Sequence, residues 1–364
     1  MHPRKSPLAL ILFILVLGAG LLALWTTSQS SPLMPQPAAN DSRIPLAILG
    51  DSDSHSYHDT LNFPPGSPDR GGRYRDQTWQ WGEVLAQLRG TELDLGPWGS
   101  WGTRRIVARL QEALGMSGRN PRKMDYRYNF AQSGAVCDDL GQGQTTRQLV
   151  ELMDQNPDRW RRGVVVIRIG VNDVGTRKDL AVWARNGQDP ALMAKVDNCV
   201  KQYQNAIQTI HRAHPDTRIV MVGLFDNSNW APLTDKWQDA ASMRNIAMGL
   251  AAFNTPLKRM AQSDKRLTFF DDQAWFRHTW GARTPDGKPD YKRVTIDGRW
   301  PTPNTQGDSP DHATVQDGHA GTIWNLKWAQ SLVDQINAAF NLKLTPVTDQ
   351  DMAQFLRDKG IQPW

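Results

Sequence analysis

Four short clusters of glycines and polar residues carry the side chains that could do chemistry. In Gly50-Asp51-Ser52, a tight turn that Gly50 permits can project the Ser52 hydroxyl away from the chain. The other clusters are Asn129-Phe-Ala-Gln-Ser-Gly134, Gly170-Val-Asn-Asp173 and Asp317-Gly-His319. Each cluster alone is typical of a turn or a helix cap. What indicates a common site is their placement along the chain.

The first three clusters stand where predicted strands end, and the fourth precedes the last long helix. Apolar runs predict strands over 44–49, 126–131, 164–169, 218–224 and 267–270. Helical periodicity predicts helices over 79–88, 103–114, 145–154, 191–211, 239–262 and 322–340. Strands alternating with helices indicate a parallel sheet covered on both faces. Such sheets bind ligands at the carboxyl ends of their strands, so we expect the clusters to converge there.

In order and placement the clusters resemble the four blocks of the SGNH hydrolases, also called GDSL-type lipases and esterases. The resemblance runs from about residue 44 to residue 340. It implies an α/β fold: a three-layer α/β/α sandwich with a central, mostly parallel five-stranded sheet of the flavodoxin-like kind. It also implies Ser52 as nucleophile, His319 as general base and Asp317 as the carboxylate that orients His319.

The same resemblance implies an oxyanion hole made by the Ser52 amide, Gly134 and Asn172. A serine hydroxyl is a poor nucleophile near neutral pH, so a neutral imidazole must take its proton during attack. A carboxylate on the other ring nitrogen fixes the tautomer, and the amide donors stabilise the tetrahedral oxyanion. This mechanism needs no cofactor and no metal.

The last cluster departs from the family pattern. The family usually has Asp three residues before His, but Gln316 stands there and Asp317 is only two residues before His319. Asp317 could reach the imidazole through a different turn, or Asp311 could serve instead. If neither does, the site is a Ser-His dyad.

Other polar residues near the clusters are candidates for substrate contact. We expect Asp51, His55 and Asp173 to bind substrate. His55 and His58 are three residues apart and could form a metal site, but a substrate wall or loop is the preferred interpretation because a serine mechanism needs no metal.

Composition excludes several classes of protein. The chain has 364 residues, is 39% hydrophobic and 22% charged, and is therefore globular. Mean hydropathy is −0.55, and one stretch, 8–25, is continuously apolar, which excludes a polytopic membrane protein. The formal charge of +5 falls to +3 once Arg4 and Lys5 are set aside, which argues against a nucleic-acid binder.

The N-terminus indicates export. A basic start and about 18 apolar residues predict a signal peptide or signal-anchor helix over 1–30, followed by a linker over 31–43. We expect an uncleaved anchor with the body on the outer, periplasmic or extracellular side, cleavage being the alternative. An exported pair, Cys137 and Cys199, either forms one disulfide or remains as two buried thiols.

One catalytic domain is expected over 44–343, with a tail and short helix over 344–364. An irregular region spans about 280–316. The chain has 15 Trp, and Trp98, Trp101, Trp230, Trp280 and Trp300 fall in predicted loops. These residues either offer platforms for sugar rings or pack the loops onto the body.

Together these features predict an exported esterase that removes a small acyl group, with acetyl preferred, from a carbohydrate or another ester. Acyl transfer to a glycan hydroxyl would use the same residues. A non-catalytic glycan-binding or scaffold protein is the alternative from another class.

Overall fold

The computed structural model describes residues 41–103, 118–141 and 145–364. The predicted leader helix, and all but Thr103 of the predicted helix over 103–114, lie outside these residues. The chain divides into the units Met1–Ser42 and Arg43–Trp364. The second unit contains all of the helices and strands described below. Among the described residues, no helix is both long and apolar enough to cross a membrane.

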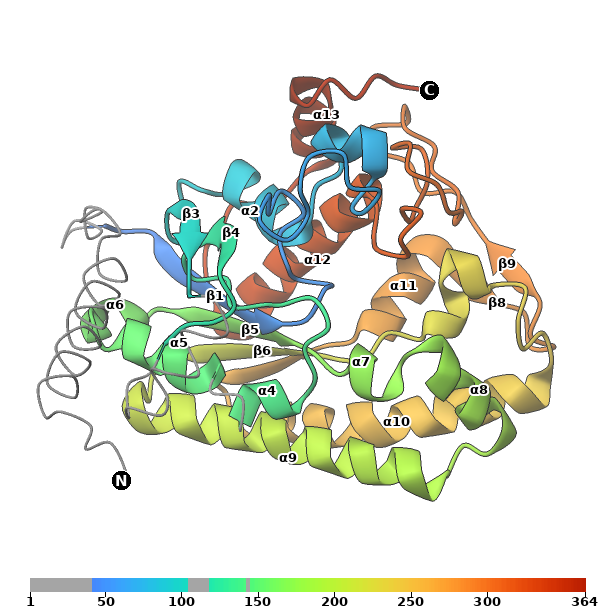
Figure 1. Cartoon of the computed structure of the whole chain (residues 1–364), viewed down its shortest axis with the longest axis horizontal. Helices are drawn as coiled ribbons and strands as arrows, with labels where there is room; N and C mark the ends of the chain where they lie inside the picture. Colours follow the sequence, from blue (N-terminus) through green and yellow to red (C-terminus); the bar gives the residue numbers. More distant parts are fainter. Residues whose placement is uncertain (1–40, 104–117, 142–144) are drawn as a thin grey trace, which may run out of the picture. The chain divides into compact units, whose positions relative to one another are not determined.

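A five-stranded parallel sheet forms the centre of this unit (Figure 1). Its strands are β1 (Ile44–Gly50), β2 (Leu93–Asp94), β5 (Val164–Arg168), β6 (Arg218–Val222) and β7 (Leu267–Phe270), in the order β2-β1-β5-β6-β7. Every neighbouring pair is parallel. Gly50 pairs with Arg168, so β1 and β5 end at the same edge. The predicted mostly parallel sheet is confirmed.

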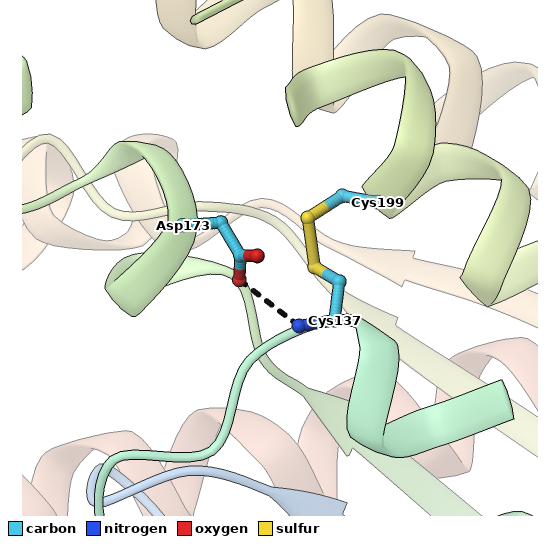
Figure 2. Close-up of side chains that lie close together, drawn as sticks. All are labelled: Cys137, Asp173 and Cys199. Carbon is cyan, nitrogen blue, oxygen red and sulfur yellow. Dashed lines mark hydrogen bonds between the residues drawn. A yellow bond between two sulfur atoms is a disulfide. The ribbon is translucent and has the colours of Figure 1, made fainter. Parts of the chain in front are cut away.

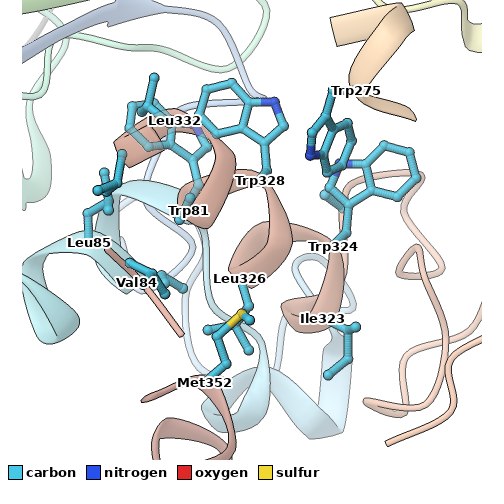
Figure 3. Packing of buried hydrophobic residues seen from close by; sticks show 14 of the residues in the cluster. Trp81, Val84, Leu85, Trp275, Ile323, Trp324, Leu326, Trp328, Leu332 and Met352 are labelled. Atoms are coloured by element: carbon cyan, nitrogen blue, oxygen red, sulfur yellow. The ribbon is translucent and has the colours of Figure 1, made fainter. Parts of the chain in front are cut away.

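Alternate residues of the strands face two separate cores. Leu46 and Ile48 of β1 pack with α2 (Trp81–Leu88) and α12 (Thr322–Phe340), where Trp81 and Trp328 lie with ring centroids 4.8 Å apart (Figure 3). Ala47 and Leu49 pack on the other side. The helices of that side include α5 (Thr145–Met153), α9 (Pro190–Ala213) and α10 (Ala240–Ser263). A strand buried on both faces reads as a continuous apolar run, as 44–49 does.

The predicted strand over 126–131 is wrong as a strand. β4 (Lys123–Tyr126) ends where it was expected to begin, and pairs antiparallel with β3 (Trp98–Trp101). The following residues nonetheless run along β1: Phe130 N–H donates to Ile48 O at 2.8 Å, and Gln132 N–H to Gly50 O at 3.0 Å. This backbone brings Gly134 to the edge where β1 ends, while β2 pairs with the start of β1.

The short helix expected within 344–364 is present as α13 (Asp349–Asp358). The remaining helices of the described residues lie outside the predicted set. They are η1 (Gly72–Gln77), α4 (Asp138–Gly141), α6 (Pro157–Trp160), α7 (Val171–Val174), α8 (Arg177–Arg185), η2 (Asn227–Asn229), η3 (Ala231–Leu233) and α11 (Asp272–Trp280). The irregular region contains only the short hairpin of β8 (Gly281–Arg283) and β9 (Pro289–Tyr291). It is anchored by apolar side chains, among them Ile296 and Trp300, which are buried in the α12 core.

Candidate active site

Ser52 lies on a tight turn after β1. The amides of Ser54 and His55 both donate to Asp51 O at 3.1 Å, and Asp53 N–H donates to Asp51 Oδ1 at 3.0 Å. A Cβ on Gly50 would lie 2.6 Å from Arg168 O, so only glycine lets β1 lie this close to β5 at the turn. Ser52 is half-buried, and within the described residues neither its hydroxyl nor its amide is hydrogen-bonded. Both groups are therefore available to a ligand.

Gly134 and Asn172 lie on neighbouring backbone. Gly134 is exposed with φ of 80°, and its amide donates to no acceptor in the described part of the chain. Asn172, in α7, donates from Nδ2 to Ala135 O at 2.9 Å. That bond uses one of its two amide hydrogens and leaves the second for another acceptor. The arrangement supplies hydrogen-bond donors of the kind that an oxyanion requires.

His319 and Asp317 are brought together. His319 Nδ1 lies 3.0 Å from Asp317 Oδ1, and the His319 amide donates to the same oxygen at 3.3 Å. The two-residue spacing works because the carboxylate accepts from the backbone two residues on, across Gly318 with φ of 83°. Asp311 instead accepts a hydrogen bond from Ser309. Of the two candidate carboxylates, Asp317 is the one beside His319.

The carboxylate of Asp317 is held ionised. Burial by itself would raise its pKa, but the hydrogen bond and charge of His319 and the guanidinium of Arg70 together hold the pKa of Asp317 well below its usual range. Trp230 fixes the same turn, because its indole N–H donates to Gly318 O at 2.8 Å.

Arg70 is a residue that the sequence analysis missed. It is 3% exposed, and its guanidinium contacts both Asp317 and Ser133, the residue before Gly134. Arg70 lies in a loop without periodicity, 247 residues from Asp317 along the chain. The sole local signal is the Gly71-Gly72 pair that follows it, which permits an unusual turn.

The three predicted substrate contacts have internal partners. Asp51 and His55 are only 1% and 2% exposed. Burial, with the charge of Asp53, raises the pKa of Asp51, and His55 hydrogen-bonds to Asp59 and Ser133. The structure therefore places both side chains in the interior rather than on a substrate-facing wall.

Asp173 is half-buried beside a disulfide that joins Cys137 to Cys199 (Figure 2). Its Oδ2 accepts from the Cys137 amide at 3.0 Å, and burial raises the pKa of Asp173 to about 6. Cys137, Asp173 and Cys199 form a compact group of metal-ligating residue types. Because both sulfurs are in the disulfide, neither is a thiolate ligand.

The tryptophans of the predicted loops divide into two groups. Trp280 is the last residue of α11 rather than a loop residue. Trp280 and Trp300 are both fully buried in the α12 core, so they serve as packing residues and cannot be sugar platforms. Trp98 and Trp101 lie in β3 rather than in a loop, and they and Trp230 are half-buried.

The model of the GDSL-like Lipase/Acylhydrolase family matches residues 48–309. No curated protein matches the sequence. The lipase Lip_vut3 from a goat rumen metagenome is 14% identical, with a TM-score of 0.38, over 83% of this chain and 100% of that one. An extracellular lipase from Streptomyces rimosus is 16% identical (TM-score 0.34, 79% and 99% covered). A family 3 carbohydrate esterase from Talaromyces cellulolyticus is 13% identical (TM-score 0.36, 82% and 100% covered).

Proposed function

Because the chain belongs to the GDSL-like lipase/acylhydrolase family and is an ester-bond hydrolase, we propose that Ser52 is its nucleophile. The observation that carries this proposal is the His319–Asp317 pair, in which a carboxylate lies 3.0 Å from the imidazole Nδ1. The pair supplies an oriented general base in the block where the spacing departs from the family pattern. It also favours an enzyme over a non-catalytic scaffold.

Catalysis proceeds in two acyl-transfer steps. Ser52 Oγ attacks the ester carbonyl while His319 Nε2 takes the hydroxyl proton, and Asp317 holds the resulting imidazolium. The amides of Ser52 and Gly134 and the free Asn172 hydrogen bind the oxyanion, each donor contributing about 3 kcal/mol. His319 then protonates the departing alkoxide as the ester C–O bond breaks. Water then attacks the acyl carbonyl while His319 takes its proton, the bond between the acyl carbon and Ser52 Oγ breaks, and His319 returns the proton to Oγ as the acid leaves.

We propose a small acyl group, acetyl, and a carbohydrate as the alcohol component. Polar or charged side chains lie at the site, among them Ser133, Asn172, Asp317 and His319. Polar groups at the site favour a short acyl group, because a long aliphatic chain gains free energy only where it can be buried against apolar surface. The buried Trp280 and Trp300 cannot contact a sugar ring, so aromatic contacts to the carbohydrate would have to come from other residues.

We also propose that the protein acts outside the cytoplasm. The Cys137–Cys199 disulfide supports this location, because structural disulfides persist in oxidising compartments. The basic and apolar residues before position 26 supply the export signal and the proposed membrane anchor.

A panel of p-nitrophenyl esters of increasing chain length tests the proposal on the full-length protein. We expect kcat/KM to be highest for acetate and to disappear in Ser52→Ala. Ser54→Ala is the matched control, because Ser54 Oγ is buried and accepts only the Trp81 indole N–H, at 3.3 Å. Activity that survives in Ser52→Ala would refute the nucleophile, and a preference for long chains would refute the acyl group. An acetylated glycan distinguishes hydrolysis from transfer. Release of free acetate supports hydrolysis, whereas appearance of the acetyl group on a second, added glycan would show that the protein is an acyltransferase instead.

A further inference from the structure

Arg70 occupies a constrained position beside the proposed catalytic residues. Its backbone has φ of 56°, in the left-handed region that a non-glycine residue enters only at a cost in free energy. Its guanidinium carbon lies 4.4 Å from the Phe63 ring centroid and 5.3 Å from that of Tyr57. A buried, strained arginine stacked on two aromatic rings is fixed by its surroundings rather than free to sample rotamers.

The guanidinium joins the two loops of the site. Nη2 donates to Ser133 Oγ at 3.1 Å, next to the Gly134 amide. On the other side, Nη1 and the Arg70 backbone N–H both donate to Asp317 Oδ2, the second at 2.9 Å. One side chain thus links the loop that carries an oxyanion donor to the loop that carries the general base.

Arg70 and Asp317 both contact Nδ1 of His319. Its Nη1 lies 2.6 Å from His319 Nδ1, and Asp317 Oδ1 lies 3.0 Å from the same nitrogen. A single nitrogen cannot donate to the carboxylate and accept from the guanidinium at once. With the proton on Nδ1, Asp317 Oδ1 accepts it while Arg70 donates to Oδ2. Both hydrogen bonds are then made, and Nε2 is free to accept a proton.

The buried His55–Asp59 pair contacts Ser133. His55 Nδ1 lies 3.0 Å from Ser133 Oγ and accepts from the Ser133 amide at 3.2 Å, while Nε2 lies 2.8 Å from Asp59 Oδ2. Burial, together with the nearby Lys123 charge, lowers the pKa of His55, which keeps the ring neutral and Nδ1 an acceptor. Asp59 is itself fully buried and also accepts the Met124 amide at 2.9 Å.

We infer that Arg70 is a positioning residue: seated on Ser133 by the Asp59–His55 pair, it holds the Asp317–His319 pair at a fixed place relative to the Gly134 amide. This inference rests on the proposed roles of Ser52 and His319. It extends them to a continuous chain of contacts, Asp59–His55–Ser133–Arg70–Asp317–His319, that aligns base and oxyanion hole. Arg70 acts through these residues and touches no substrate.

The Ser133–His55–Asp59 set also has the residue types of a nucleophile, a base and an acid. Its His55 is 2% exposed, and Ser133 Oγ already accepts from Arg70, so the set is built as an internal support. Acylation of Ser133 is therefore an outcome that the experiment must be able to detect.

The test compares two buried arginines of the same loop region. Arg70→Ala removes the bridge, whereas Arg75→Ala removes a guanidinium that donates to the carbonyls of Phe63 and Tyr57 and contacts none of the proposed site residues. We expect Arg70→Ala to lower kcat about 100-fold, the cost of a misplacement near 1 Å, with KM changed less than about threefold. Guanidinium ion below denaturing concentration should restore part of the lost kcat in Arg70→Ala only.

Arg75→Ala should lose stability and keep kcat. Arg70→Lys, which keeps the charge but cannot reach Ser133 and Asp317 together, should fold and still lose most of kcat. Equal kcat losses in the two alanine variants, or no rescue by guanidinium, would overturn the inference, as would full activity of Arg70→Lys. Mapping the acyl group on the wild-type protein separates the two claims: acyl on Ser133 overturns the inference, whereas absence of acyl from Ser52 overturns the proposed function.

Discussion

Asp317 reaches His319 through a turn whose spacing differs from the usual one. The carboxylate accepts from the His319 amide and lies against Nδ1, so a separation of two residues achieves what a separation of three does elsewhere. Gly318, with φ of 83°, is the residue that permits it. The orientation of His319 therefore depends on the Asp317 carboxylate.

Asp317→Asn should therefore lower kcat by up to about 10⁴-fold while leaving KM and folding nearly unchanged. The amide can donate to Nδ1 and favour the tautomer that cannot accept the Ser52 proton. Asp311→Asn, whose side chain is bonded to Ser309, should change kcat less than about twofold. Steady-state kinetics with p-nitrophenyl acetate measures both. If kcat falls less than about tenfold in Asp317→Asn, the site is a Ser-His dyad.

His55 gives the protein a pH-dependent stability. Because its folded pKa is lowered, the unfolded chain binds a proton at His55 that the folded chain does not, once pH falls below the ordinary value of about 6.5. The contribution of neutral His55 to the unfolding free energy is therefore fully present at neutral pH and is lost on acidification.

Urea unfolding measured at about pH 7.5 and about pH 5 should show that the wild type loses unfolding free energy at the lower pH through His55, and that His55→Gln does not share this loss. The stability difference between wild type and His55→Gln should thus narrow at the lower pH, by about 1.4 kcal/mol per unit of pKa shift within that window. A difference that stays constant or widens would show that His55 is not neutral in the folded protein.

At the scale of elements, the Cys137–Cys199 disulfide ties the segment after Gly134 to α9, across 62 residues of sequence. A loop of this length confers roughly 4 kcal/mol in the chain-entropy account of cross-links. The double variant Cys137→Ala/Cys199→Ala should lose about 2–5 kcal/mol of unfolding free energy in urea titrations. Dithiothreitol should destabilise the wild type alone. Two titratable thiols in unreduced protein would contradict the pairing.

Four of the five sheet strands could be predicted from the sequence, because β1, β5, β6 and β7 are continuous apolar runs buried on both faces. β2 could not, since two residues, Leu93 and Asp94, give no period. The segment 126–131 lies along β1 but forms only one isolated bridge with it, between Ile48 and Asn129, and so is not a strand.

The candidate site shows the same division. Ser52, Gly134, Asn172 and His319 stand in local clusters, and the resemblance of these clusters to the SGNH hydrolase blocks selects them as candidates. Arg70 and the Asp59–His55 pair act through contacts between residues up to 249 positions apart. No local pattern encodes such a contact, and Arg70 lies in a loop of Pro, Gly and Asp that reads as an ordinary connection.

At the scale of the whole molecule, the proposal places the hydrolase body outside the cell membrane on an uncleaved anchor formed by residues 8–25. The full-length protein should then remain in the membrane fraction after high-salt and carbonate washes. It should also be digested by protease added to spheroplasts. A mature N-terminus after Ala23 in Edman sequencing would show that the leader is cleaved. Resistance of residues 44–364 to protease in intact spheroplasts would show that they lie in the cytoplasm.

The central claim is that Ser52, activated by His319, forms the covalent acyl-enzyme, and labelling with a fluorophosphonate tests it most directly. The nucleophilic oxygen bonds to phosphorus and displaces fluoride, so peptide mass spectrometry identifies the residue without reference to substrate. The account predicts a single adduct on Ser52 in the wild type, and none on this residue in His319→Ala. An adduct on Ser133, or equal labelling of Ser52 in His319→Ala, would contradict it.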